Sequence, residues 1–126
     1  MDSSKLKIIT LNAHRIGRLS KILKLNEIIS RENAHFIHIQ EIVVSSAIKV
    51  FSQEYQVLIN YEQGAEDTDG VGIITLVAKR LNISDFIIGE KGRTIGVKAQ
   101  DVQTWHCYPK SGSENKKWRE SYFRET

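Results

Sequence analysis

The spacing of apolar residues in the first part of the chain predicts a strand, a helix and a second strand. The segment 6–11 is short, apolar and rich in β-branched residues, which is typical of a buried strand. Over 19–29, apolar residues recur every three or four positions and form one helical face, with Ser20 as the expected N-cap and Asn33 as a left-handed C-terminal residue. A second apolar run follows at 36–40. This order predicts a βαβ unit with two parallel strands and a right-handed crossover.

The rest of the chain is expected to add a second helix and several strands. Ser45 or Ser46 can cap a helix whose inner face carries Ala47, Ile48 and Phe51. Further strand-like runs follow at 55–59, 70–78, 83–89, 94–99 and 102–108. The short separations between the last three runs predict hairpins instead of helical crossovers.

Two further segments complete the expected organisation. Residues 60–69 are polar and acidic and are expected to form a surface loop before the strand 70–78, which is apolar on both faces. Ser113 can cap a final helix that carries Trp118, Tyr122 and Phe123. We therefore expect one α/β unit with a mixed sheet and helices on one side.

Composition narrows the class of protein only slightly. The 18 Lys and Arg against 15 Asp and Glu give a net charge of +3, which permits a polyanionic partner such as DNA without requiring one. No apolar run is long enough to span a membrane, and the N-terminus lacks a secretory core. Cys107 is the single cysteine of the sequence, which favours a reducing location, nuclear or cytoplasmic.

Asn12 and Glu41 are the most informative polar pair. Each follows an apolar strand of the predicted βαβ unit by one residue. Ligands of such sheets bind beyond the carboxyl ends of the strands, where an amide can orient a phosphoryl oxygen or water and a carboxylate can bind Mg²⁺. Taken alone, both residues also fit ordinary turn chemistry.

The order of five motifs resembles the endonuclease/exonuclease/phosphatase superfamily. These motifs are Ile8-Ile9-Thr10-Leu11-Asn12, Ile37-His38-Ile39-Gln40-Glu41, Gly70-Val71-Gly72-Ile73, Gly92-Arg93 before Thr94-Ile95-Gly96-Val97, and Tyr108-Pro109-Lys110-Ser111-Gly112 with Asn115, Arg119 and Phe123 behind it. The last motif is most similar to the apurinic-type endonuclease domain of LINE-like non-LTR retrotransposons.

The resemblance implies a role for each matched residue. Glu41 would bind the catalytic Mg²⁺, Asn12 would arrange the phosphate site, and Tyr108 would contact the scissile phosphate. Arg93 would contact the DNA backbone. Ser111 and Asn115 would add further substrate contacts. His106-Cys107-Tyr108-Pro109 departs from the family pattern, which places Asn two residues before the Tyr and a small residue after it.

The same resemblance predicts that residues 1–126 form the N-terminal half of a four-layer α/β/β/α sandwich, the DNase I-like fold. The motifs of the family's second half, an Asp-x-Asn, a further Asp and an Asp-His pair, do not occur in this order here. We therefore expect a DNA-nicking, Mg²⁺-dependent phosphodiesterase fragment with weak or no activity of its own. We also expect an exposed inner sheet face at Ile73 to Val77, leading to self-association or binding of a complementing chain.

Other interpretations remain open at this stage. The chain also fits a non-catalytic, nucleic-acid- or protein-binding remnant of a retrotransposon, a lipid or inositol phosphate phosphodiesterase, or a small α/β domain without a nucleic-acid role. Asp67 and Asp69 are expected to be solvated loop residues, and Cys107 an inert buried thiol. The histidines His35, His38 and His106 are expected to be structural.

Overall fold

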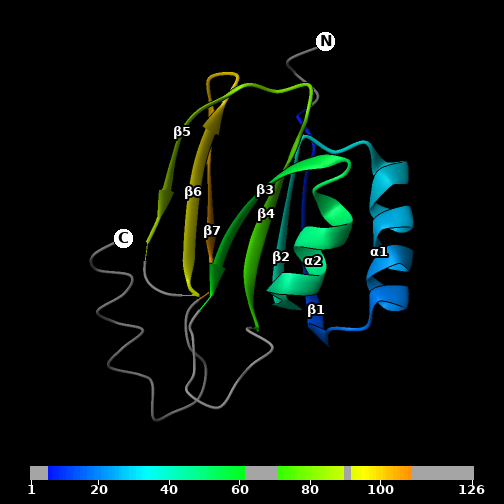
Figure 1. Ribbon diagram of the computed structural model, residues 1–126. Helices are drawn as coiled ribbons and strands as arrows, with labels where there is room; N and C mark the ends of the chain where they lie inside the picture. Colours follow the sequence, from blue (N-terminus) through cyan, green and yellow to red (C-terminus); the bar gives the residue numbers. More distant parts are fainter. Residues whose placement is uncertain (1–5, 62–70, 90–91, 109–126) are drawn as a thin grey trace.

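Two β-sheets lie face to face, and two helices cover the outer face of one of them (Figure 1). The computed structural model describes residues 6–61, 71–89 and 92–108. In chain order the elements are β1 (Ile8–Ile16), α1 (Leu19–Glu32), β2 (Phe36–Val43), α2 (Val44–Phe51), β3 (Tyr55–Tyr61), β4 (Val71–Ala78), β5 (Ile83–Ile88), β6 (Thr94–Ala99) and β7 (Val102–Cys107). One sheet has the order β1-β2-β4-β3 and the other β5-β6-β7. The predicted α/β class with helices on one side is confirmed.

The βαβ unit forms as the apolar pattern predicts. β1 and β2 are parallel neighbours, with Ile8 opposite Phe36, and Asn33 ends α1 in the left-handed conformation at φ 49°. Both predicted N-caps are wrong. The residue before α1 is Arg18, so Ser20 already lies inside the helix. Because β2 runs into α2 without a loop, Ser45 and Ser46 likewise lie within the first turn of α2.

β4 is buried on both faces because it lies between the helices and the second sheet. Ile74 and Leu76 belong to the core beneath α1 and α2, and Val77 packs in a second core with Val97 and Ala99 of β6. The expectation that Ile73 to Val77 forms an exposed inner face is therefore wrong. The strands β5, β6 and β7 cover that face within the chain itself.

Exposed apolar side chains lie on α1, at Leu19, Leu23 and Ile28, and on the second sheet, chiefly on its edge strand β5. Phe86, Ile87 and Ile88 are exposed, with 54% of Phe86 accessible. On β7, Trp105 lies over Gly96 of β6, where an added Cβ would come within 2.5 Å of the indole ring. Within the described residues, β5 has a strand neighbour on one side only, which leaves this apolar edge uncovered.

Several smaller expectations also have an outcome. Asn60 belongs to β3 and is buried, so it is not part of a surface loop. Cys107 is exposed, because alternation along β7 turns Thr104 and His106 inward and Cys107 outward. Residues 62–69 and the predicted helix after Ser113 lie outside the described residues. Among the described residues, no helix combines the length and apolar character needed to cross a membrane.

Candidate functional site

Two facing bulges in β1 and β2 create the site. The ladder pairs Asn12 with Gln40 and Ile16 with Ile42, so residues 13–15 of β1 stand opposite the single residue Glu41. Glu41 has φ 56°, and residues 14 and 15 have φ values of 52° and 64°. Such left-handed conformations are costly for residues with a Cβ, and bulges commonly redirect side chains beside functional sites. The sequence placed both strand ends too early: Asn12 and Glu41 lie within the strands, at the bulges.

Asn12 and Glu41 contact each other directly. The amide nitrogen of Asn12 donates a hydrogen bond to Oε2 of Glu41, and the amide oxygen accepts one from the backbone N–H of His14 at 2.7 Å. These two partners fix the orientation of the amide. The Asn12 hydrogen bond is the main reason that the pKa of Glu41 is lowered. Burial is the next largest effect and opposes the shift, while the Tyr108 hydrogen bond and the charges of His14 and Arg15 lower the pKa further. Glu41 is thus held as a carboxylate.

Tyr108 reaches the same carboxylate from the other sheet. It follows the last residue of β7, and its phenol hydrogen-bonds to Glu41. Burial and then this interaction with Glu41 raise the pKa of Tyr108, while the positive charges of Arg93 and Arg15 oppose the rise. The phenol is therefore a neutral hydrogen-bond donor at physiological pH.

Arg93 lies beside Tyr108. Its guanidinium carbon is 5.7 Å from the centroid of the phenol ring, and its Nη1 is 3.5 Å from the carbonyl oxygen of Tyr108. The backbone N–H of Tyr108 donates to the carbonyl of Arg93 at 2.8 Å. Four of the six residues singled out from the sequence therefore lie together: Asn12, Glu41, Arg93 and Tyr108. The other two, Ser111 and Asn115, lie outside the described residues, as do Asp67 and Asp69.

Two residues of the β1 bulge, which stands opposite Glu41, were not predicted as site residues from the sequence. His14 and Arg15 are both exposed, and both act electrostatically on Glu41. Nothing in the residue pattern signals a bulge at this point, since 13–15 read as an ordinary polar turn after the strand. The bulge keeps these residues at the carboxylate and brings a second arginine to the site.

A buried polar chain lies behind the site, between the two sheets. His38 Nδ1 lies 3.0 Å from Thr75 Oγ1, which lies 3.5 Å from His106 Nδ1. His106 Nε2 lies 3.2 Å from Oε1 of Gln40, the neighbour of Glu41. The two imidazole rings contact each other at a centroid distance of 4.8 Å. Burial lowers the pKa of His38 to about 4 and is the main cause that lowers the pKa of His106 to about 3. Both imidazoles are neutral at pH 7.

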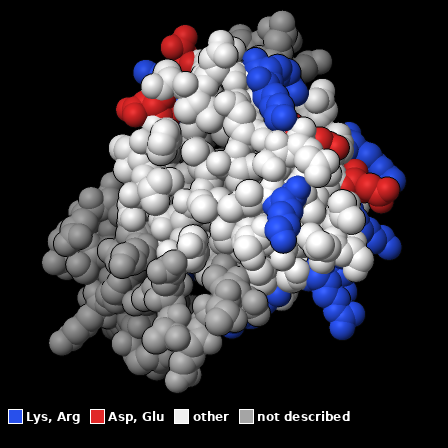
Figure 2. Space-filling view, in the orientation of Figure 1, with Lys and Arg blue, Asp and Glu red and all other residues white. Residues whose placement is uncertain are grey.

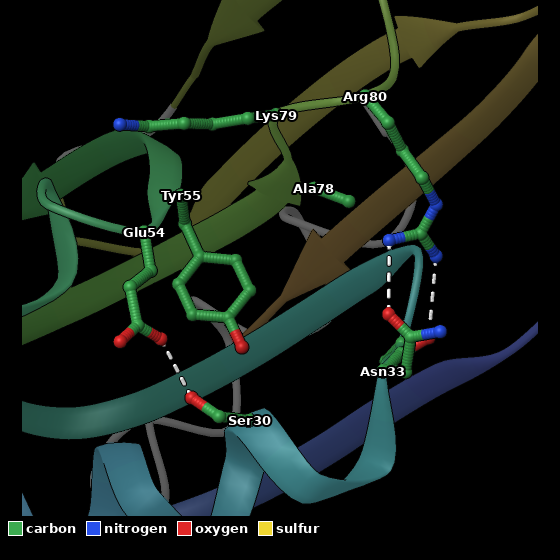
Figure 3. A pocket seen from close by; sticks show the side chains of 8 residues that line it. Ser30, Asn33, Glu54, Tyr55, Ala78, Lys79 and Arg80 are labelled. Atoms are coloured by element: carbon green, nitrogen blue, oxygen red, sulfur yellow. Dashed lines mark hydrogen bonds between the residues drawn. The ribbon is translucent and has the colours of Figure 1, made fainter.

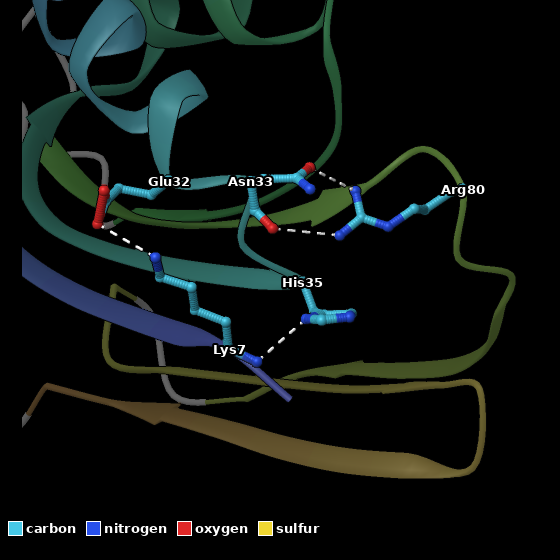
Figure 4. Close-up of polar contacts among 5 residues, drawn as sticks. All are labelled: Lys7, Glu32, Asn33, His35 and Arg80. Atoms are coloured by element: carbon cyan, nitrogen blue, oxygen red, sulfur yellow. Dashed lines mark hydrogen bonds and ion pairs between the residues drawn. The ribbon is translucent and has the colours of Figure 1, made fainter. Parts of the chain in front are cut away.

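The third histidine, His35, lies at the opposite end of the sheet. Its Nδ1 accepts a hydrogen bond from the backbone N–H of Lys7 at 3.0 Å, and Lys7 pairs with Glu32 (Figure 4). These two contacts of Lys7 tie the start of β1 to the end of α1 and to the residue before β2. His35, His38 and His106 thus have the structural hydrogen bonds expected of them, and none of these bonds involves the Glu41 carboxylate.

A hollow of about 280 Å³ also lies at that opposite end, between the end of α1, the start of β3 and the turn after β4 (Figure 3). Two pairs of its polar lining residues bind each other: Ser30 donates to Glu54 at 2.7 Å, and Arg80 donates to the side chain and backbone oxygens of Asn33. Glu41 is not among the residues that line the hollow.

The donor set at the bulges fits a divalent cation in part. Within the described ranges, no three His, Cys, Asp or Glu side chains gather closely enough to hold a metal ion by themselves. Glu41 supplies one ionised carboxylate. Magnesium is commonly bound by one or two carboxylates together with water and substrate phosphate. Glu41 therefore fits as one ligand of a site that needs further oxygen ligands.

The comparison with solved structures identifies the fold. The sequence matches no protein-family profile and no curated protein. Among solved structures, TDP2 from C. elegans matches with a TM-score of 0.70 at 15% identity, covering 94% of this chain and 40% of that one. A humanized D. rerio TDP2 carrying 14 mutations matches with a TM-score of 0.69 at 16% identity, covering 97% of this chain and 54% of that one.

The endonuclease domain of TRAS1, a telomere-specific non-LTR retrotransposon, matches with a TM-score of 0.60 at 16% identity. The match covers 96% of this chain and 54% of that domain. The chain thus spans about two fifths to one half of the length of these structures. The similarity extends over nearly all of this chain. The chain thus has the DNase I-like fold that these structures share.

Proposed function

We propose that this chain carries the first half of a phosphodiesterase site, and that the substrate is DNA. The observation that carries the proposal is the contact between Asn12, Glu41 and Tyr108. Asn12 lies on β1 and Glu41 on β2 of the first sheet, whereas Tyr108 follows β7 of the second sheet. An amide and a carboxylate held at the bulges of two parallel strands, together with a phenol from the second sheet, offer both a cation ligand and hydrogen-bond donors for phosphate oxygens. Their convergence is difficult to explain as ordinary turn chemistry, because two backbone bulges are needed to produce it.

In this proposal Glu41 is a ligand of a divalent cation such as Mg²⁺. The bound cation would neutralise charge that develops on the phosphoryl group. Asn12 orients the carboxylate through its own hydrogen bond. Tyr108 donates its phenolic hydrogen to Glu41 and can turn it to a phosphate oxygen nearby. The raised pKa keeps that proton on the phenol during the exchange.

The two arginines give the site a net positive charge. Arg15 and Arg93 both act electrostatically on Tyr108, whereas Glu41 is the acidic residue that acts on it. A site with two guanidinium groups and one carboxylate suits the single negative charge of a phosphodiester, and guanidinium can bind phosphate oxygens in bidentate fashion. On the face drawn in Figure 2, the Lys and Arg side chains of the described residues are scattered and do not form one patch. We expect phosphate binding to depend chiefly on Arg15 and Arg93.

DNA is the favoured substrate because one matching fold is a retrotransposon endonuclease domain. A lipid or inositol phosphate diester would use the same charge pattern and is the second candidate within the phosphodiesterase class. A non-catalytic binding module would keep the arginine contacts and lose the dependence on metal. The two classes separate by experiment: salt-sensitive DNA affinity without any effect of Mg²⁺ is the signature of the binding module.

The chain by itself should nick DNA weakly or not at all. One carboxylate is a poor site for an ion that prefers octahedral oxygen coordination, and the chain spans about half of the matching folds. The test is nicking of supercoiled plasmid with Mg²⁺ by the wild-type chain, by Glu41→Gln and by Glu27→Gln, an exposed carboxylate on α1 used as a control. Strong nicking that only Glu41→Gln abolishes would refute the need for the second half.

The same preparations test the proposal of a phosphodiester site. Duplex DNA and Mg²⁺ should each raise the thermal stability of wild type and Glu27→Gln, because ligands that bind the folded state stabilise it. In Glu41→Gln the effect of Mg²⁺ should be lost. If neither DNA nor Mg²⁺ changes the stability of the wild-type chain, the proposal fails and a domain without a nucleic-acid role is favoured.

We further propose that the apolar edge of β5 binds a second copy of this chain. Phe86, Ile87 and Ile88 are exposed on a strand whose outer edge has no described neighbour. An exposed apolar edge strand pairs readily with another edge, and two copies related by a twofold axis would join β5 to β5. In the matching structures, more than two fifths of the polypeptide lies beyond the part that this chain spans. A complementing chain with that remaining part of the fold is the other outcome to test.

A further inference from the structure

Asn60 joins the two sheets at the end where the candidate site lies. It is the last residue but one of β3, and 5% of it is exposed. Its side-chain oxygen accepts a hydrogen bond from the backbone N–H of Gly92 at 2.8 Å, and its side-chain nitrogen donates one to the carbonyl of Thr94 at 2.9 Å. Both contacts cross from the first sheet to the start of β6 in the second sheet.

These two hydrogen bonds bracket Arg93. A side-chain amide has the same donor and acceptor as a peptide group, so Asn60 pairs with residues 92–94 as a neighbouring strand would. Gly92 has φ 69°, a conformation that glycine adopts without strain. The backbone of Arg93 is thereby held on both sides.

The constraint continues from Arg93 to Tyr108. The carbonyl of Arg93 accepts the backbone N–H of Tyr108 at 2.8 Å, and the Arg93 guanidinium lies 5.7 Å from the Tyr108 ring. Tyr108 in turn hydrogen-bonds to Glu41. A continuous set of contacts therefore leads from Asn60 to the carboxylate of the site, although Asn60 itself touches neither Tyr108 nor Glu41 in any described contact.

The backbone of β3 at Asn60 is tightly packed. Its strand neighbour is β4, where Gly72 lies so near that an added Cβ would come within 2.4 Å of the Asn60 carbonyl oxygen. Close packing of backbone on backbone leaves the β3 strand no room to shift. A rigid support is what a side chain needs if it is to fix the position of a neighbouring loop.

We propose that Asn60 is a positioning residue, which fixes the backbone of 92–94 and thereby places Arg93 and Tyr108 at Glu41. The part of Arg93 and Tyr108 in phosphate contact rests on the proposed function, but their placement by Asn60 does not. The residue reads from sequence as the first position of a polar loop, and only its burial and its two contacts reveal this role.

The test compares Asn60→Ala with Gln56→Ala. Gln56 is a matched control: it lies on the same strand, and its side-chain nitrogen donates to the carbonyls of Ala78 and Leu81, at the end of the sheet away from the site. The readout is the hydrogen exchange of the Tyr108 backbone amide, followed by NMR of the ¹⁵N-labelled chain, because this N–H donates to the carbonyl of Arg93. If Asn60 holds residues 92–94 in place, its loss should weaken this hydrogen bond and speed the exchange.

We expect the Tyr108 amide to exchange about tenfold faster or more in Asn60→Ala than in wild type, and at the wild-type rate in Gln56→Ala, with the buried amides of β2 as the internal reference. Asn60→Ser, which keeps a hydroxyl too short to reach both partners, serves if the alanine variant does not fold, and should give a smaller acceleration. An unchanged exchange rate of the Tyr108 amide in the folded Asn60 variants, or an equal change in Gln56→Ala, would overturn the proposal. The measurement needs neither DNA nor metal, so its result stands apart from that of the proposed function.

Discussion

The buried pair His38 and His106 should make the fold sensitive to mild acid. In the folded chain their pKa values are about 4 and about 3, against the ordinary value of 6.5 for histidine. Below pH 6.5 the unfolded chain therefore binds protons that the folded chain does not. Stability is fully present above pH 6.5 and is lost as the pH falls towards the folded pKa values.

The size of the effect follows from these values. At pH 5, protonation of each histidine shifts the folding equilibrium towards the unfolded state by a factor of roughly 30, which corresponds to about 2 kcal/mol. The two residues together remove about 4 kcal/mol between pH 8 and pH 5, a large part of the 5–15 kcal/mol that is usual for a domain. Glu41 does not contribute strongly in this window, because its pKa is lowered from 4.5 and its titration lies below pH 5.

The assay is urea unfolding followed by far-UV circular dichroism at pH 8, 7, 6 and 5. The double variant His38→Gln/His106→Gln keeps polar side chains at both positions and removes both titrating groups, so its stability should vary much less with pH. Val97→Ala, which shortens a fully buried side chain of β6, should lower stability by a similar amount at every pH. If the wild type and the double variant lose the same free energy between pH 8 and pH 5, the assignment of acid sensitivity to this pair is refuted.

Three further outcomes follow from the packing and the charges. Gly72→Ala should destabilise the fold by more than about 3 kcal/mol, because the added Cβ would meet strand backbone. Gly96→Ala should cost only about 1–2 kcal/mol, because the added Cβ would meet the half-exposed ring of Trp105, which can turn away. Equal losses of unfolding free energy in urea for the two variants would contradict this difference. Phe86→Lys should reduce self-association measured by light scattering over a range of concentrations, and an unchanged mass would exclude the β5 edge as the interface. Arg15→Gln should weaken duplex DNA binding and reduce its salt dependence by about one phosphate contact, and an unchanged salt slope would remove Arg15 from the site.

Much of the fold could be predicted from the sequence because the apolar pattern is strong where burial is one-sided or complete. The strands 36–40 and 70–78 and the left-handed Asn33 followed directly from such patterns. Helix starts were misplaced, since β2 leads straight into α2 and no connecting residue is left to act as a cap. The exposed face was misplaced as well. An apolar run shows that a strand is covered on both faces, but it does not show which part of the chain covers it.

The candidate site shows a similar division. Asn12 and Glu41 could be singled out because each follows a recognisable apolar strand, and Tyr108 and Arg93 because they belong to motifs in a familiar order. The roles of Arg15 and Asn60 could not be predicted, since they depend on a bulge and on an inter-sheet contact. Both features arise from tertiary packing, on which single-residue preferences carry no information.

The most direct test of the central claim is whether a divalent cation binds beside Glu41. Mn²⁺ can replace Mg²⁺ at oxygen sites and broadens the NMR signals of nearby nuclei. Added to the ¹⁵N-labelled chain at neutral pH, Mn²⁺ should selectively broaden the amide signals of residues 12–15, 41 and 108, and Glu41→Gln should abolish this broadening while Glu27→Gln leaves it intact. Broadening that is absent from these residues in the wild type, or that persists in Glu41→Gln, would contradict a phosphodiesterase site built on this carboxylate.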